Sequence, residues 1–265
     1  KNFLNNFIKK GFPNRKQEDW KFLDISQIIK KNISNLSYFN DYSQSNKIDP
    51  SIFVDGLEHN KIIFINGRIE KIDFNFEDQN KIEIIDETKK DISFDYENSL
   101  IDLNSAFTDK VFKIIIKKNY SLKKPLIIYH STNDKIKSTN INLRLDFELG
   151  ENSCLKLIDY FADITTKNFI NIFYNFNLEK DSILKNYKID KFINNNLKYS
   201  FNNIEQGNNS VSETFILSAG SDYLKNEINC NLNGSYSSAF VNGIFSLTKK
   251  NSQFIFVLLY QLLSR

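Results

Sequence analysis

The sequence predicts a mainly β protein built around a parallel β-helix, a solenoid of stacked coils of chain. Three observations lead to this prediction. The 265 residues contain 24 Phe and 12 Tyr together with many Ile and Asn, and these residue types favour strands and turns. From residue 141 onward, short apolar strands alternate with polar turns. This alternation recurs with a nearly constant period, which indicates a repeat architecture.

The repeat is visible when four segments are aligned on one serine each. The serines lie 29, 28 and 28 residues apart, at Ser153, Ser182, Ser210 and Ser238. The position after each serine is apolar: Cys154, Ile183, Val211 and Ala239. The position six residues before each serine is also apolar: Phe147, Phe176, Ile204 and Leu232. The position seven residues before each serine is polar: Asp146, Asn175, Asn203 and Asn231. A β-helix buries such equivalent apolar positions by stacking them, whereas a β-sandwich predicts only frequent short strands.

The N-terminal region is predicted to be helical. Phe3, Leu4, Phe7 and Ile8 have helical spacing, and Gly11 stands where such a helix would end. Asn14 with Gln17 and Asp24 with Gln27 have the spacing of a capping box. These pairs predict two short helices around Trp20, the second of which ends near residue 31. Residues 32–50 are polar and are interpreted as a linker.

The middle of the chain is predicted to consist of strands around one short helix or loop. Asn66-Gly67 between two apolar runs is a strong hairpin signal. Residues 99–107 form the helix or loop, and the following run KVFKIIIKK alternates as a strand. KPLIIYH is a strand that opens at Pro125. We therefore divide the chain into a helical region with linker (1–50), a β-rich lead-in (51–135), β-helix coils (136–247) and an off-pattern tail (248–265).

Composition and charge limit the classes of function. The net charge is only +3 and the basic residues are scattered, so no nucleic-acid binding is expected. No apolar run reaches the roughly 20 residues that cross a membrane, and two cysteines that lie 76 residues apart suggest no disulfide framework. A cytoplasmic protein is the simplest interpretation. The chain contains no methionine, so we expect its N-terminus to be trimmed.

Few residues are candidates for chemistry. Cys154 falls in the apolar stacked column and is expected to be a small buried hydrophobe; Cys230 shares a mixed column with Leu145, Tyr174 and Asn202 and is expected to be buried too. His59 and His130 are expected to face solvent or bond locally. No nucleophile elbow, Walker A loop or dinucleotide fingerprint occurs, and LSAGSDY (217–223) is interpreted as a turn.

A carbohydrate-active β-helix would carry a ladder of carboxylates on one outer face. Asp159 and Asp163 are the candidates in the first coil. The same columns in later coils hold no acid: Lys188 and Ile216 follow Asp159, and Phe192 and Gly220 follow Asp163. We therefore predict no enzyme, and no catalytic, cofactor-binding or metal-ligating residue.

The stretch GFPNRKQEDWKFLDIS, from residue 11, resembles the opening motif of SufD, a subunit of the Suf iron–sulfur cluster assembly complex. The matching positions are Gly11, Pro13, Lys16, Glu18, Trp20 and Lys21. Asn14 replaces the family's Ser or Thr, and Leu23 stands where Thr is common. IIFINGRIEKI, LIDLNSAF with the strands after it, and LGENSCLKLIDYF are similar to later family blocks, so the resemblance covers about Gly11 to Leu247.

The resemblance implies a right-handed β-helix and a non-enzymatic scaffold. It also implies pairing with a SufB-like subunit, binding of a SufC-like ATPase, and a nascent iron–sulfur cluster at the complex interface. The matched motif residues are expected to be structural: Trp20 packs between the short helices and the β core, and Glu18 pairs with Lys21 at the surface.

The chain departs from the family at its end. Residues after Leu247 are expected to leave the repeat and the family pattern, as in a partial gene product that ends in a shifted frame. Without a cap, the open strand edges would be covered by the tail (254–263) or would aggregate. The alternatives to a SufD-like subunit are a SufB-like paralogue, a β-helix carbohydrate-active enzyme and a purely structural solenoid.

Overall fold

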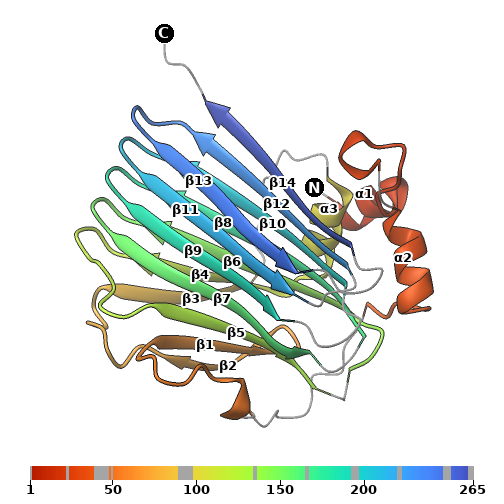
Figure 1. The fold of residues 1–265 in the computed structure, drawn as a ribbon, viewed down its shortest axis with the longest axis horizontal. Helices are drawn as coiled ribbons and strands as arrows, with labels where there is room; N and C mark the ends of the chain where they lie inside the picture. Colours follow the sequence, from red (N-terminus) through yellow and green to blue (C-terminus); the bar gives the residue numbers. More distant parts are fainter. Residues whose placement is uncertain are drawn as a thin grey trace.

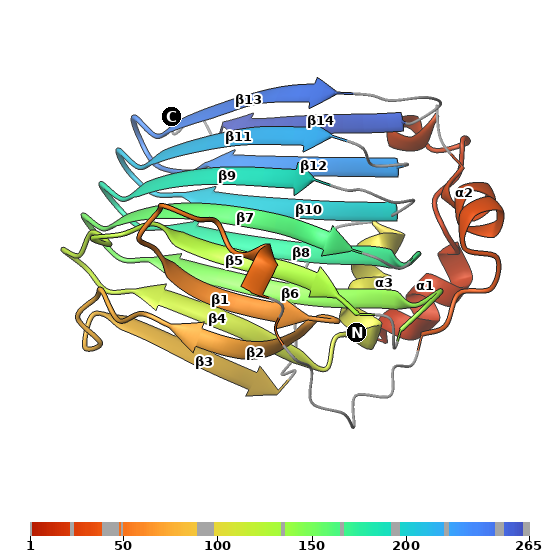
Figure 2. The same cartoon turned by 60° about the horizontal axis from the view of Figure 1, so that its bottom comes forward.

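Two seven-stranded sheets, stacked face to face, form a flattened parallel β-solenoid, as predicted (Figures 1 and 2). The structure, a computed structural model, describes residues 2–21, 24–38, 48, 50–88, 98–133, 136–164, 167–191, 197–219, 223–246 and 252–261. We call the two sheets the odd sheet and the even sheet. In the odd sheet the order is β13 (Ser238–Ser246), β11 (Val211–Ala219), β9 (Ile183–Lys191), β7 (Cys154–Ile164), β5 (Leu126–Thr132), β1 (Asn60–Ile65) and β2 (Arg68–Asp73). In the even sheet it is β14 (Ser252–Gln261), β12 (Tyr223–Leu232), β10 (Leu197–Gln206), β8 (Phe169–Leu178), β6 (Asn140–Leu149), β4 (Lys110–Ile116) and β3 (Ile82–Thr88).

Antiparallel pairs start both sheets, and every later pair is parallel. The β1–β2 hairpin turns at Asn66 and Gly67, whose φ angles of 54° and 81° are those of the predicted tight turn. The glycine is also required by space, because an added Cβ would lie 2.8 Å from Cγ2 of Ile141 in β6. The hairpin is thereby seated directly on the first coil.

The repeating serines close the turns between the even and odd strands. In three successive turns the serine Oγ donates to the carbonyl three residues before it: Ser182 to Glu179 (2.6 Å), Ser210 to Gly207 (2.8 Å) and Ser237 to Gly234 (2.8 Å). The residue before each serine has a positive φ. The fourth serine is therefore Ser237 and not Ser238 as predicted. The reason is that corner lengths vary, so that β13 pairs with β11 at an offset of 27 residues and β12 with β10 at 26.

An apolar core fills the interior from the base of the solenoid, which is the end formed by β1, β2 and β3. Phe147, Phe176 and Ile204 stack in register and are fully buried, as predicted. Cys230, and not Leu232, continues this column. Larger inward side chains of the same sheets complete one continuous core that runs from Ile62 to Cys230.

Helices pack on the outer face of the even sheet where its strands begin (Figures 1 and 2). These are α1 (Phe3–Lys10), α2 (Ile25–Asn32) and α3 (Ser99–Phe107), with the 3₁₀ turn η1 (Glu18–Trp20) between the first two. Helix α1 ends at Gly11, and Asp24 caps α2 by accepting from the Gln27 amide at 3.0 Å, both as predicted. Asn14 accepts from the amide of Lys16 and caps no helix, so the second predicted helix is only the turn η1.

The block LIDLNSAF, which lies in α3, attaches this helix to the even sheet. Asn104 of α3 donates its amide to the carbonyls of Leu143 in β6 (3.0 Å) and Asn171 in β8 (2.8 Å). Asn171 in turn donates to the carbonyl of Leu100 at 2.9 Å. Buried amides must find such partners, and these bonds fix α3 across two coils.

The prediction that the tail leaves the repeat is wrong for residues 252–261. They form β14, which pairs in parallel with β12, with Tyr223 opposite Ser252. The tail thus adds another rung to the even sheet. Leu23, Phe192 and residues 220–222 of the predicted turn lie outside the described residues, as do most of the predicted linker and residues 262–263 of the tail.

Candidate functional site

A buried polar cluster occupies the middle of the solenoid, at the inner face of both sheets. Its centre is Asp159 of β7, which is fully buried. One carboxylate oxygen accepts from His130 Nε2 of β5 at 2.8 Å. The other accepts from the hydroxyl of Tyr174 in β8 at 2.7 Å and from Nζ of Lys188 in β9 at 2.9 Å. Four strands of three coils therefore meet at one carboxylate.

Opposite charges decide the protonation states in this cluster. Burial by itself would raise the pKa of Asp159, but the charge of Lys188 and the hydrogen bond from His130 outweigh it and hold that pKa well below its ordinary value. Burial lowers the pKa of His130 despite the neighbouring Asp159, so its imidazole is neutral at pH 7 and donates through Nε2–H. Burial also raises the pKa of Tyr174 well above its usual value, so the phenol keeps its proton.

A second buried ion pair lies one coil further along. Nζ of Lys198 in β10 is 2.6 Å from Oδ1 of Asp190 in β9, and both side chains are fully buried. The same Nζ lies 3.4 Å from the ring centroid of Phe161, at cation–π distance. Near His130 a cavity of about 20 Å³ adjoins the ring, enough for about one water molecule. The interior thus holds charged and hydrogen-bonded groups beside the apolar core that continues to Cys230.

These positions correct one prediction, that for His130, and show where Asp159 points. His130 neither faces solvent nor bonds locally: it is 5% exposed and contacts a carboxylate of the next coil. Asp159 points inward, so it cannot contact an external polysaccharide; the side chain of Asp163 lies outside the described part. The signal for the cluster was present in the sequence, because Lys188 stacks on Asp159 in register and opposite charges in one inward column pair with each other.

The remaining histidine is also buried. His59 is 7% exposed, with Nδ1 2.6 Å from the carbonyl of Leu57 and Nε2 2.8 Å from the hydroxyl of Tyr129. The local bond agrees with the prediction, and the contact with β5 adds to it. This arrangement attaches the segment before β1 to the outer face of the odd sheet.

The two cysteines lie in different sheets, Cys154 in the odd sheet and Cys230 in the even sheet. Cys154 was predicted to point inward, but it is half-buried on the outer face, and its neighbour Leu155 is the inward residue. The column was misassigned because apolar residues occupy both faces of this sheet, which leaves the two-residue period ambiguous. Cys230 is fully buried, as expected, and burial raises the pKa of its thiol to about 12.

Trp20 anchors the helical region to the even sheet, as predicted. It is 4% exposed and packs against Tyr199 of β10. Nζ of Lys225 in β12 lies 3.6 Å from the centroid of the indole ring and donates to the carbonyl of Asp19 at 2.8 Å. Lys225 also pairs with Glu227, which accepts from the hydroxyl of Tyr199. Glu18 and Lys21 form the predicted surface pair, at 2.7 Å.

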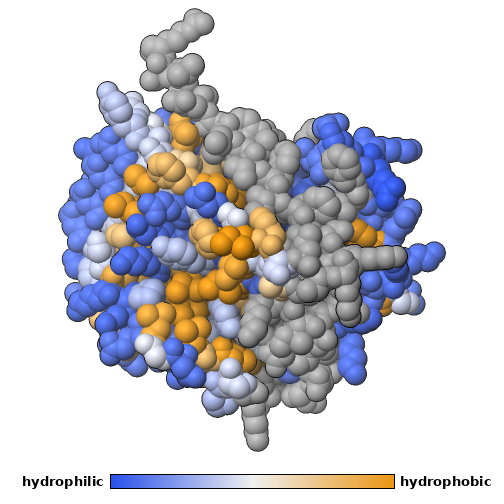
Figure 3. Space-filling view, viewed as in Figure 1, coloured by the Kyte–Doolittle hydropathy of each residue, from blue (hydrophilic) through white to orange (hydrophobic). Residues whose placement is uncertain are grey.

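The outer face of the odd sheet carries apolar patches between hydrophilic ones (Figure 3). The outward residues of β7, β9, β11 and β13 form two adjacent apolar columns, which we call the apolar face: Ile158, Tyr187 and Phe215, then Tyr160, Ile189, Leu217 and Ile244. Tyr187, Leu217 and Ile244 are 39%, 41% and 58% exposed. Nearer the base, the segment around η2 (Pro50–Ile52) covers equivalent residues of β1 and β5. A contiguous exposed apolar surface of this kind is typical of protein interaction sites.

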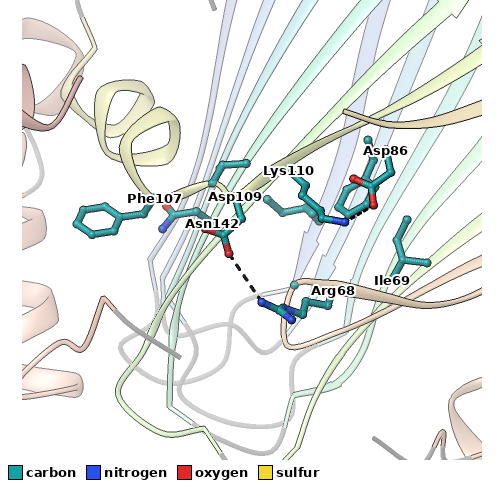
Figure 4. Close-up of a pocket in the computed structure, with 11 residues that line it drawn as sticks. Arg68, Ile69, Asp86, Phe107, Asp109, Lys110 and Asn142 are labelled. Atoms are coloured by element: carbon teal, nitrogen blue, oxygen red, sulfur yellow. Dashed lines mark hydrogen bonds and ion pairs between the residues drawn. The ribbon is translucent and has the colours of Figure 1, made fainter. Parts of the chain in front are cut away.

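A pocket opens at the base of the solenoid (Figure 4). It has a volume of about 250 Å³ and lies between the β1–β2 hairpin, β3, the end of α3, β4 and β6. Among the described residues no three His, Cys, Asp or Glu side chains gather as a metal site would require. No described helix has the length and apolar character needed to cross a membrane.

Comparison with known proteins gives one finding. The model of the family described as "SUF system FeS cluster assembly, SufBD core domain" matches residues 128–260, half of the chain. The match includes the buried polar cluster, the apolar face and β14. The predicted loss of the family pattern after Leu247 is therefore wrong. A search of curated proteins found no match to the chain.

Proposed function

The chain belongs to the SufB/SufD family of iron–sulfur cluster assembly proteins, and on this premise we propose that it is a SufD-like scaffold subunit. In this proposal it pairs with a SufB-like subunit and a SufC-like ATPase in the cytoplasm, and a nascent cluster, the cargo of the complex, forms at the subunit interface. The observation that carries the proposal is the family match across the coils of the solenoid. Cluster assembly by a scaffold needs a rigid surface for partners, and two stacked parallel sheets supply one.

The cysteines support a SufD-like role over a SufB-like one. Cysteine ligates a cluster as the thiolate, and burial raises the pKa of both thiols, that of Cys230 to about 12. Both thiols are therefore protonated at pH 7, which fits a chain that shapes an interface better than one that supplies cysteine ligands. The SufB-like paralogue is the second candidate, since the family match covers both subunits.

The apolar face supports work within a complex. Its exposed side chains, Tyr187, Leu217 and Ile244, come from three neighbouring strands of the odd sheet, so they form a surface that a partner could cover. A purely structural solenoid would have no use for this surface. The carbohydrate-active alternative loses its first acid, because Asp159 is enclosed between the sheets.

Co-purification tests the proposal. The full chain is co-expressed with a SufB homologue and a SufC homologue, and the tagged chain is isolated under reducing, anaerobic conditions. We expect both partners to be recovered in stoichiometric amounts. Recovery of the SufC homologue with a second copy of this chain in place of SufB would support the SufB-like alternative. If the chain recovers neither partner, the proposal fails.

A further inference from the structure

The chain covers the base of its own odd sheet with a short segment, which we call the strap (residues 50–59, orange in Figure 2). Ile52 and Phe53 of the strap pack on the outward side chains of β1 and β5. The Phe53 ring meets the Tyr129 ring edge-on, with 5.2 Å between the centroids, and the amide of Val54 donates to the Tyr129 hydroxyl at 3.1 Å. Tyr129 is fully buried as a result.

The column of side chains that begins at Tyr129 continues into the apolar face. Tyr129 is followed in register by Tyr160, Ile189, Leu217 and Ile244. The exposed fraction rises along this column, from 0% at Tyr129 to 41% at Leu217 and 58% at Ile244. The column is apolar at both ends, so the difference lies in the cover. The strap therefore shows, within this molecule, what kind of segment fits the surface.

A lysine accompanies this surface in its covered part and again in its open part. Lys124, just before β5, binds Glu58 of the strap at 2.6 Å. Lys156 lies near the start of β7, the next strand of the odd sheet, and its side chain is exposed. A carboxylate that follows the apolar residues of a docked segment would meet Lys156 as Glu58 meets Lys124.

The open part of the apolar face has the size of a peptide site. Tyr187, Leu217 and Ile244 are about half-exposed and together leave roughly 300 Å² of their surface open. A stable complex of two folded proteins buries about 800 Å² on each partner. The open part is therefore too small for a second copy of this chain, and it is large enough for the few side chains of one segment.

We propose that the apolar face binds a segment of a partner chain that is built like the strap, with two consecutive bulky apolar residues and a carboxylate at the spacing of Phe53 and Glu58. The apolar pair would cover Leu217, the segment's backbone would donate to the hydroxyl of Tyr187, and the carboxylate would bind Lys156. Only the origin of the segment, a partner subunit of the complex, rests on the proposed function.

A synthetic peptide of strap residues 50–58 is the probe, titrated by calorimetry into the full chain. Burial of its Phe and Val side chains supports a Kd of about 1 mM. A peptide with Ser in place of both Phe53 and Val54 should not bind, and a peptide with Glu58→Gln should bind about threefold more weakly. Absence of binding at about 10 mM, or equal binding of the serine peptide, would overturn the proposal.

Photo-crosslinking locates the bound peptide. With p-benzoylphenylalanine in place of Phe53, mass spectrometry should find crosslinks on β9 and β11. Crosslinks confined to β1 and β5 would show that the peptide only exchanges with the strap, and they would overturn the proposal.

Variants of the full chain test the same surface. Leu217→Lys should weaken peptide binding at least about tenfold, because it places a charge where the apolar pair docks. The matched control is Ile72→Lys in β2: Ile72 is 44% exposed, and it pairs with the inward Ile62, so it lies on the other face of the odd sheet. It should leave the affinity unchanged, and circular dichroism checks that both variants fold. An equal loss of binding in the two variants would count against the proposal.

Three outcomes separate the docking site from the proposed function and from a second copy. If the SufB and SufC homologues co-purify with the chain but the peptide does not bind, the proposed function stands and the docking site is overturned. If the peptide binds at the apolar face but neither homologue is recovered, the docking site is supported and the proposed function fails. If sedimentation shows a dimer that Leu217→Lys converts to a monomer, the face belongs to a second copy and the assignment to a partner's segment is wrong.

Discussion

Replacement of Asp159 by Asn tests how strongly the buried cluster supports the solenoid. The substitution keeps the shape of the side chain but removes the charge that faces Lys188, whose side chain is 1% exposed. Breaking a buried pair by removing one partner costs about 3–5 kcal/mol, because the remaining charge stays buried without compensation. We therefore expect Asp159→Asn to lower the free energy of unfolding by about this amount.

The double variant separates this cause from simple loss of packing. In Asp159→Asn with Lys188→Met no charge is left unpaired, so it should be more stable than Asp159→Asn alone by about 2 kcal/mol. Glu213→Gln is the matched control, because it breaks the exposed pair with Lys185 in a neighbouring position of the same sheet and should cost no more than about 1 kcal/mol.

Urea unfolding at pH 7, followed by far-ultraviolet circular dichroism, measures these differences. Tryptophan fluorescence is unsuitable for this purpose because the single Trp20 reports on the helical region. The pH dependence gives a second readout. The folded pKa of Asp159 lies below its unfolded value of about 3.9, so its contribution is present above that pH and is lost as the pH falls through the folded pKa. The reasoning is refuted if Asp159→Asn costs less than about 1 kcal/mol, or if the effects of the two substitutions add.

Three further predictions concern single residues. Tyr236 has a φ of 59° in the last described turn, and its side chain is exposed; Tyr236→Asn should raise the urea midpoint, with a gain of about 1 kcal/mol, because Asn tolerates the left-handed conformation. The depressed pKa of His130 means that the unfolded chain binds more protons than the folded one just below pH 6.5, so stability should fall as the pH drops from about 6.5 to 5. That slope should flatten in His130→Gln and remain in His59→Gln. Lys225→Met leaves Glu227 without its cation beneath Trp20. The tryptophan emission should shift to the red, and the unfolding transition seen by fluorescence should precede the one seen by circular dichroism. Coincident transitions would show that Lys225 does not hold the helical region on the sheet.

The periodic features were readable from the sequence because stacked coils repeat the same local chemistry. The turn serines, the Asn66–Gly67 hairpin and the inward column of Phe147, Phe176 and Ile204 are all local patterns or repeats of them. The alternation of apolar and polar residues did not show which side chains point inward where both faces of a strand are apolar. Cys154 shows this, since its apolar column belongs to the outer face.

The later coils were harder to read because their corners differ in length. A constant period of 28 residues placed Leu232 beside Ile204, but β12 pairs two residues earlier and puts Cys230 there. The same irregularity made residues 252–261 look like an unrelated tail, although their backbone continues the even sheet. Register between coils is decided by hydrogen bonds between strands, and a sequence shows it only when the corners are uniform.

The sequence by itself determined the class of fold and the helical region before it, because both depend on local propensity and on the spacing of apolar residues; the role of Trp20 as an anchor came from the family resemblance of the motif around it. Only the tertiary structure decided what the buried charges do. Asp159, His130, Tyr174 and Lys188 come from four different strands, and their pairing depends on which side chains the two sheets turn toward each other. The same holds for the pocket rim, where Arg68, Asp109, Lys110 and Asp86 meet from three strands and one loop. The period along the chain places Lys188 beside Asp159, but it does not show that both face inward or that His130 and Tyr174 meet them.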